Sequence, residues 1–472
     1  MKRFLCIALV LMLVLGLCAC GEGGATDEDK GLQAGFGRVN ITPKYPVRLA
    51  GGASERTSEG FRDISYITCV AVKSEGQTYL VCTMDFICAE DKFVDPAKGA
   101  MSDATGVPVE NILMNATHTH SGVAIRTDGW ENVDKYRAEF FGWATEAAKK
   151  AVEDLSAAEV YSGSSETEGL AFVRHYKCSD GSYAGPNFGS YSSGAVEHVG
   201  KADTDVQVIR FVRPAEDKKD IVMMSFPAHA TMNSSTTNIQ VSADYPGATR
   251  DYIESKSDAQ VAFFIAAAGN QVPSSKIANE GSTTDYMVYG QRLGDYVLKV
   301  MENMTKVEGT GVVLKTHQFV GKHIKEGLDR LTDAQLVKAE WDLVGRGTTE
   351  GSNAAKKHGF SSVYEVSAVL ERATTPETKT MDLKVMSIGN IGMIFAPYEM
   401  FGETALDIKA RSPYDFTFVV TCGEGAMGYM PTPIGFEINS YESHVTDFAR
   451  GTAEELADTF VNLLTEIKNP AQ

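Results

Sequence analysis

Residues 112–122 read I-L-M-N-A-T-H-T-H-S-G, an apolar run that passes directly into two histidines, His118 and His120. The chain of 472 residues contains only nine histidines. Side chains alternate along an extended segment, so these two imidazoles are expected to point to the same side. Two imidazoles on one face can share a metal ion, or one can bind a metal while the other faces a substrate. A hydrogen-bonded histidine pair at a strand end is the alternative interpretation.

Several other apolar runs have the length and composition of buried strands. They lie at 66–72, 78–84, 206–212, 221–226, 261–267, 312–314 and 393–395. Segments with helical periodicity lie between several of them, at 137–155, 245–255, 286–304, 333–344, 399–410 and 453–467. Continuous apolar strands that alternate with amphipathic helices predict an α/β fold, with a layered mixed β-sheet flanked by helices.

Two further strand ends supply candidate metal ligands. His229 follows the apolar run I-V-M-M-S-F, and Glu399 follows I-G-M-I-F-A-P-Y, where we expect it to begin a helix. Ligands of α/β proteins collect beyond the carboxyl ends of the strands, so His118, His229 and Glu399 are expected to meet. Two histidines, one carboxylate and an open position form a catalytic zinc set. Taken singly, each of these residues is also compatible with an ordinary structural role.

The N-terminus has the layout of a secretory signal. Lys2 and Arg3 precede a largely apolar stretch, and L-C-A-C at 17–20 resembles a bacterial lipobox, in which the signal is cut before the cysteine. We therefore expect residues 1–20 to be a lipoprotein signal peptide, Cys20 to carry the lipid, and the polar residues 21–32 to form a flexible tether. An ordinary signal with an incidental cysteine is the alternative. The expected location is the cell envelope, on the outer face of the cytoplasmic membrane or in the periplasm.

Charge and cysteine content exclude several classes of protein. Loss of Lys2 and Arg3 with the signal leaves 42 basic against 62 acidic residues, a net charge near -20. Such an acidic chain is a poor candidate for binding nucleic acid or an anionic membrane surface. Five cysteines remain besides the anchor, at scattered positions and without a C-x-x-C pair, which indicates buried thiols rather than a disulfide framework. We expect residues 33–472, without a Pro-rich or Ser-rich linker, to form a single catalytic domain.

Short motifs spread over nearly the whole of this region resemble the neutral ceramidase family, zinc-dependent amidases that cut the N-acyl bond of ceramide. T-H-T-H-S-G at 117–122 is the most specific match, whereas Asn40 stands where the family's opening motif has aspartate. The other matching segments are G-F-G-R-V-N-I-T-P (35–43), L-V-C-T-M-D (80–85), H-A-T-M (229–232), S-A-D-Y-P-G (242–247), A-A-G-N-Q-V-P (267–273), A-P-Y-E (396–399) and G-Y-M-P-T (428–432).

The resemblance implies roles for particular residues. It implies zinc held by His118, His229, Glu399 and Tyr429, with His120 beside the metal facing the substrate. His120 and Tyr429 are the implied catalytic groups, which stabilise charge on the substrate oxygen and, for His120, transfer a proton to the leaving amine. The candidates for substrate binding or for support of a ligand are Asp244, Arg174 and Asn270. For Tyr429 an aromatic packed near a loop, and for Arg174 a surface ion pair, are the alternatives.

Two departures from the family limit the substrate prediction. Val272 occupies the position of a serine to which a catalytic role is assigned in ceramidases, and Ser274 and Ser275 are out of register with it. The chain also leaves no room, after its last predicted helix, for the β-sandwich that follows the catalytic domain in ceramidases. A mechanism in which zinc-bound water attacks the substrate tolerates the loss of this serine better than a mechanism in which the serine is the nucleophile.

These observations leave three hypotheses of function. The first is a lipid-anchored zinc hydrolase of ceramidase type that cleaves ceramide or a related lipid amide. The second is a related metal hydrolase of a non-lipid amide or ester, which the valine at position 272 favours. The third is a non-catalytic solute-binding lipoprotein, which would bind no stoichiometric zinc.

Overall fold

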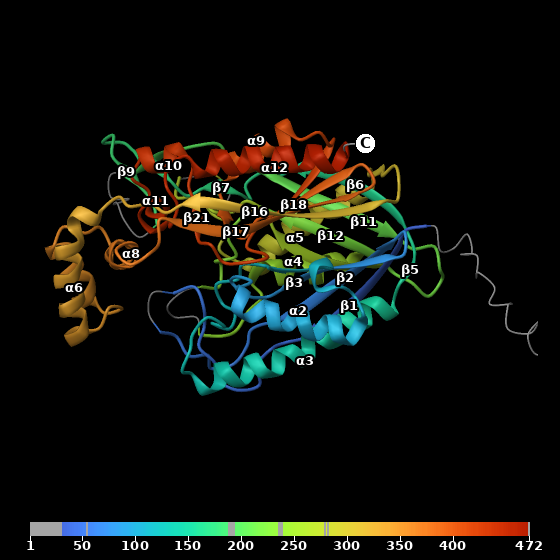
Figure 1. Ribbon diagram of the computed structural model, residues 1–472, viewed down its shortest axis with the longest axis horizontal. Helices are drawn as coiled ribbons and strands as arrows, with labels where there is room; N and C mark the ends of the chain where they lie inside the picture. Colours follow the sequence, from blue (N-terminus) through green and yellow to red (C-terminus); the bar gives the residue numbers. More distant parts are fainter. Residues whose placement is uncertain are drawn as a thin grey trace, which may run out of the picture.

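Three β-sheets share one central core in the computed structural model, which describes residues 31–52, 55–186, 194–234, 239–277, 280 and 283–470. The predicted signal peptide, the predicted lipidation site Cys20 and nearly all of the predicted tether lie outside the described residues. The predicted α/β fold class, a layered mixed sheet with flanking helices, is confirmed, and the strands divide among three large sheets and several small ones. Figure 1 shows strands in the middle of the molecule, with helices along the top and along the bottom of the view.

The first sheet has the order β4-β3-β2-β1-β5 and mixes antiparallel pairs with one parallel pair, β3 with β4. Its strands are β1 (Gln33–Asn40), β2 (Tyr66–Ser74), β3 (Gln77–Met84), β4 (Ile112–Ala116) and β5 (Ser156–Ala157). Its outer face is covered by α2 (Asp91–Thr105) and α3 (Glu131–Glu153). The histidine motif leaves this sheet at the carboxyl end of β4.

The second sheet, β13-β12-β11-β6-β15, carries α4 (Asp244–Lys256) and α5 (Tyr286–Met301) on its outer face. Its strands are β6 (Glu159–Glu166), β11 (Asp205–Val212), β12 (Asp220–Phe226), β13 (Ala259–Ile265) and β15 (Thr305–Lys306). The third sheet, β16-β17-β18-β20, carries α9 (Gly402–Arg411) and α12 (Thr452–Lys468). Its strands are β16 (Val312–Lys322), β17 (Thr378–Ile388), β18 (Ile391–Phe395) and β20 (Phe416–Val420).

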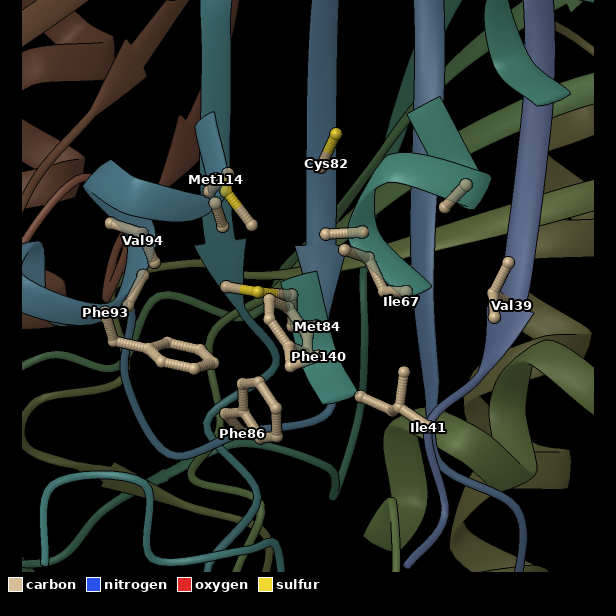
Figure 2. Close-up of a cluster of buried hydrophobic side chains, with 14 of the residues drawn as sticks. Val39, Ile41, Ile67, Cys82, Met84, Phe86, Phe93, Val94, Met114 and Phe140 are labelled. Carbon is tan, nitrogen blue, oxygen red and sulfur yellow. The ribbon is translucent and has the colours of Figure 1, made fainter. Parts of the chain in front are cut away.

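Alternation along the strands divides the buried side chains between two kinds of core. In β3, Cys82 and Met84 pack under α2 and α3, as Figure 2 shows, whereas Val81 points into the space enclosed by the three sheets. Met223 of β12 and Met393 of β18 reach the same central space from the other two sheets. Both faces of these strands are therefore buried, which explains why they read as continuous apolar runs.

Glycines let α3 lie directly on β1. A Cβ atom added to Gly35 or Gly37 would stand 2.1 Å or 2.0 Å from the carbonyl oxygens of Ala151 and Ala147. No side chain fits at such a distance, so the G-F-G of the first motif is explained by helix-to-strand packing.

Short elements connect the sheets around one end of the molecule. The two-residue pair β19 (Glu399–Met400) and β21 (Tyr429–Met430) is parallel, and β14 (Gln271–Val272) pairs with β7 (Phe172–Val173). The remaining elements are β8 (Tyr176–Cys178), β9 (Tyr183–Ala184), β10 (Ala195–His198), α10 (Pro433–Glu437), α11 (Tyr441–Val445) and the 3-10 helices η2 (Val109–Asn111) and η4 (Leu328–Arg330).

A helical arm is inserted between the antiparallel strands β16 and β17. It consists of α6 (Leu331–Val344), α7 (Thr349–Lys357) and α8 (Val363–Arg372), and has its own small core around Trp341 and Phe360. Figure 1 shows α6 at one end of the molecule, away from the sheets. Arg372 of α8 fastens the arm to the body by donating to the carbonyl oxygens of His444 and Thr446, at 2.6 Å and 3.0 Å.

Two local predictions were wrong. Glu399 begins a short strand rather than a helix, because its N–H donates to Gly428 O at 2.8 Å, and the helix starts at Gly402. The backbone at His118 is not extended but left-handed, with φ of 64°, since β4 ends at Ala116. None of the helices in the described parts of the chain combines the length and the apolar character that crossing a membrane requires.

Candidate metal centre

Three histidines and one glutamate from different strand ends meet at the centre of this end of the molecule. His118 follows β4, His229 follows β12, and Glu399 follows β18. His120 Nε2 lies 3.4 Å from His118 Nε2, and Glu399 Oε2 lies 3.3 Å and 3.1 Å from the Nε2 atoms of His118 and His229. The three imidazoles form a group that can hold a metal ion.

The backbone orients all three imidazoles in the same way. Nδ1 of His118, His120 and His229 faces the carbonyl oxygens of Ile87, Gly51 and Ala268, at 2.7 Å, 3.3 Å and 2.6 Å. An Nδ1–H that donates to a carbonyl leaves Nε2 as the nitrogen able to bind a metal. Each Nε2 atom is thereby directed at a shared position.

The spacing of these atoms fits a tetrahedral zinc ion. Zinc–nitrogen bonds of about 2.0–2.1 Å place the ligand atoms of a tetrahedral site about 3.3 Å apart. The three atom pairs measured around His118 and Glu399 agree with that spacing. Glu399 Oε2 is buried and accepts no hydrogen bond from the described residues, although it lies among the imidazole nitrogens. A buried carboxylate oxygen in that state is suited to bind a cation.

Charges within the cluster set its protonation. Burial alone would raise the pKa of Glu399, but His118 and His229 hold it well below its usual range. Burial lowers the pKa of His118, yet Cys422 and Glu399 outweigh burial and raise it well above its ordinary value. Burial and the neighbouring imidazoles lower the pKa of His120, and burial with the charge of Arg174 lowers that of His229 to about 4. His118 is therefore the histidine that must lose a proton when a metal binds.

Tyr429 stands next to Glu399 across the β19–β21 pair. Its ring is stacked on that of His229, with centroids 6.4 Å apart, and the Arg174 guanidinium carbon lies 5.4 Å over its face. Burial and then the charge of Glu399 raise the pKa of Tyr429 well above 10. The predicted fourth ligand thus borders the imidazole cluster, and its role as a ligand stays a prediction.

The three supporting candidates differ in their distance from the cluster. Arg174 is buried, and its Nη1 lies 3.3 Å from His229 Nε2, so the alternative of a surface ion pair is wrong. Asp244 holds a loop instead, since its carboxylate accepts from the N–H groups of Asn233 and Tyr245, and burial raises its pKa to about 6. Asn270 is hydrogen-bonded to Glu403 and Gly402 at the start of α9.

The position of the missing serine lies in the short β14–β7 ladder. Val272 pairs with Phe172, two residues before Arg174. Ser275 is engaged elsewhere, because its hydroxyl contacts His198 Nε2 at 3.2 Å and accepts from Ile277 N–H at 2.9 Å. The interpretation of this serine as a loop hydroxyl agrees with these contacts.

Three contributors to the site were given no role from the sequence. Glu442 and His175 bind each other and hold Arg174, from positions 267 residues apart. Gly51 has φ of 81°, and a Cβ there would stand 2.6 Å from His120. Each of these contacts depends on chain segments that meet only in the folded protein.

Solved structures supply the comparison for the whole fold. The crystal structure of neutral ceramidase from Pseudomonas aeruginosa superimposes with a TM-score of 0.69, covering 94% of this chain and 76% of that chain. The fold is that of neutral ceramidase. A ceramidase structure described as complexed with C2 gives a TM-score of 0.68, covering 93% of this chain and 76% of its own. The predicted resemblance is thereby confirmed at the level of the fold.

Sequence similarity to these neutral ceramidase structures is low, at 17% and 16% identity. No protein-family model matches the chain, and no curated protein sequence matches it. The likeness therefore establishes the neutral ceramidase fold, and the activity has to be argued from the site.

Proposed function

We propose that this protein is a zinc-dependent hydrolase that cleaves the N-acyl amide bond of ceramide or a related lipid. The observation that carries the proposal is the position of Glu399 Oε2, which lies 3.3 Å and 3.1 Å from the Nε2 atoms of His118 and His229, at the spacing of tetrahedral ligands. The ceramidase fold of the chain supports the amide as the reacting group.

His118, His229 and Glu399 would hold the zinc ion, with Tyr429 completing the site. The burial of both histidines and the backbone contacts of their Nδ1 atoms keep these side chains in place before any metal arrives. A bound zinc ion supplies a Lewis acid for the amide carbonyl and lowers the pKa of a water molecule to about 7.

His120 is the residue suited to move a proton. It is the histidine of the cluster with a partly exposed side chain, whereas His118 and His229 are buried. Its low pKa leaves the imidazole neutral, and therefore able to accept a proton and pass it to the leaving amine. Arg174 holds a fixed positive charge beside His229, where it can donate to a negatively charged oxygen of the substrate.

A related amide or ester of a non-lipid compound is the second candidate substrate. Val272 favours it, because a valine side chain can neither attack a carbonyl nor donate a hydrogen bond at the serine position of ceramidases. With either substrate, we propose attack by water rather than by a side chain of the protein. We also propose that Cys20 anchors the protein by lipid to the outer face of the cytoplasmic membrane or in the periplasm.

The test is hydrolysis by the purified chain after removal and restoration of zinc. Ceramide, a short N-acyl amide of a hydrophilic amine and the corresponding ester should be compared at equal concentration. We expect hydrolysis to disappear with a chelator and to return with zinc. His120→Ala should keep the zinc and lose roughly 10²–10⁴-fold in kcat. Stoichiometric zinc without hydrolysis of any of the three compounds would contradict the proposed hydrolysis, whereas a folded chain that binds no stoichiometric zinc would favour a solute-binding protein.

A further inference from the structure

Arg174 is directed at the metal centre by a buried carboxylate on its far side. Glu442 Oε1 accepts from Arg174 Nε at 2.8 Å and contacts Nη2 at 2.5 Å. The remaining terminal nitrogen, Nη1, lies 3.3 Å from His229 Nε2. The guanidinium group therefore has one edge held by Glu442 and the other turned toward the cluster.

The other oxygen of Glu442 is held as well. His175 Nε2 lies 2.7 Å from Glu442 Oε2, so neighbouring residues of one segment bind both oxygens of the same carboxylate. The Glu442 side chain is 0% exposed and that of His175 is 1% exposed. Charged hydrogen bonds in such an interior fix the geometry of all three groups.

The short helix α11 sets the position of Glu442 from outside the cluster. Ser440 caps this helix by accepting from Ser443 N–H, and Thr446, directly after it, donates its hydroxyl to Tyr429 O at 2.9 Å. The helix that carries Glu442 is thus joined by this hydrogen bond to the strand that carries Tyr429. A shift of α11 would move both the arginine and the tyrosine of the metal centre.

We propose that Glu442, supported by His175, is a positioning residue that holds Arg174 so that its Nη1 group meets an anionic group bound at the metal centre. This proposal rests on the proposed zinc site. It adds Glu442 and His175, neither of which is a proposed metal ligand, to the residues that recognise negative charge on the substrate.

Positioning and simple charge compensation predict opposite results. If Glu442 only balanced the charge of Arg174, removing its negative charge would leave the centre more positive and strengthen the binding of an anion. If Glu442 positions Arg174, the same substitution releases the guanidinium and weakens anion binding, although the net positive charge has increased.

The experiment is titration of the zinc-loaded full chain with acetohydroxamate, a small anionic zinc ligand, followed by calorimetry. Glu442→Gln should bind zinc at the stoichiometry of the wild type and bind acetohydroxamate roughly 10–100-fold more weakly, the range for residues that support a metal site. Arg174→Gln should weaken binding to a similar degree. The Arg174→Gln, Glu442→Gln double variant should bind acetohydroxamate no more weakly than Arg174→Gln alone, because Glu442 acts through that arginine.

Glu365 offers a matched control on α8. It is also a buried glutamate held by an arginine and close to a histidine, with Arg330 Nη1 at 2.7 Å and His444 Nδ1 at 3.5 Å. Its partners do not include the metal ligands. Glu365→Gln should therefore leave the affinity for acetohydroxamate within about twofold of the wild type. Glu442→Gln, by contrast, should weaken it by roughly 10–100-fold.

Two further results keep the test decisive. If Glu442→Gln does not fold, Glu442→Asp keeps the charge and draws the carboxylate back by one methylene, and it should still weaken acetohydroxamate binding. Unchanged or tighter binding in the folded Glu442 variant, with zinc bound, would overturn the positioning role alone. A wild-type chain that takes up no zinc would instead overturn the proposed function and this inference with it.

Discussion

Two clusters of the same three residue types each include one residue of α11. Arg174, Glu442 and His175 form the inner cluster, whose side chains are 9%, 0% and 1% exposed. Arg330, Glu365 and His444 form the outer cluster, between the arm and the body, and are 29%, 10% and 16% exposed. The inner arginine faces His229, a proposed metal ligand, whereas the outer arginine lies 3.8 Å over the ring of Phe360 in the arm.

The comparison teaches that residue type does not reveal the role of such a cluster. In the interior, an arginine without its carboxylate would be an uncompensated charge, so the pair must be complete. Near the surface, water screens the outer pair and compensates for the loss of a partner. Two properties therefore distinguish the inner cluster, which belongs to the site, from the outer cluster, which joins the arm to the body. They are the burial of the cluster and the group that its arginine faces.

The largest contrast should appear in zinc binding. Glu399→Gln removes a ligand charge from the metal centre, and we expect the affinity for zinc to fall by more than about 100-fold, the upper end of the range for residues that only support ligands. Glu365→Gln, in the outer cluster, should not change it. Competition with a chelator of known affinity measures both variants. Equal affinities in the two would contradict the role of Glu399 as a zinc ligand.

Stability should separate the two glutamates next. Glu442→Ala leaves Arg174 buried without its partner and should reduce the free energy of unfolding by roughly 3–5 kcal/mol. Glu365→Ala should cost about 1 kcal/mol, because Arg330 can reach water. Urea denaturation of both variants provides the values. The Arg174→Gln, Glu442→Gln double variant should be more stable than Glu442→Ala, and the opposite order would contradict a buried charge pair.

The pH dependence of zinc binding should follow His118. Its raised pKa means that the metal-free imidazole carries a proton at neutral pH, and zinc must displace that proton. The affinity should therefore rise with pH, by up to about tenfold per unit, until the pH passes the pKa of His118. Calorimetry in buffers of different ionisation enthalpy should detect about one released proton per zinc from His118, and a second if Tyr429 binds as the phenolate. Uptake without proton release would show that His118 is neutral before the metal binds.

The smallest effect is expected where the arm touches α11. Tyr364 of α8 packs edge-on against Tyr441, with ring centroids 5.4 Å apart. Tyr364→Ala should lose about 0.5–1.5 kcal/mol for the aromatic pair, in addition to the burial of its ring against the arm, and should leave zinc affinity unchanged. Thermal unfolding and the chelator competition test both parts. A large loss of zinc affinity would mean that the arm, and not only the body, maintains the metal centre.

The sequence predicted the elements whose side chains are buried on both faces. The strands around residues 70, 82 and 114 were found because their apolar runs are continuous, and α3 and α12 because their periodicity is clear. β16 was predicted only at 312–314, since its later residues alternate between polar and apolar and many are exposed. Glu399 was expected in a helix because the hydrogen bond that holds it in β19 comes from Gly428, distant in the sequence.

The candidate site was predictable only where local pattern carried it. His118, His229 and Glu399 each follow an apolar strand, and the rule for strand ends brought them together correctly. His118 and His120 were expected to lie together, and they do. The reason given, an extended backbone, was wrong, because the chain turns at His118. Glu442 and His175 could not be connected, because nothing local distinguishes a buried glutamate from one on the surface.

The most direct test of the central claim is elemental analysis of the purified chain beside a His118→Ala, His229→Ala double variant, with circular dichroism to confirm that both are folded. We predict about one zinc per wild-type chain and none in the double variant. A folded wild-type protein that contains no metal, and takes up none when zinc is added, would contradict the metal centre and the hydrolysis that we derive from it.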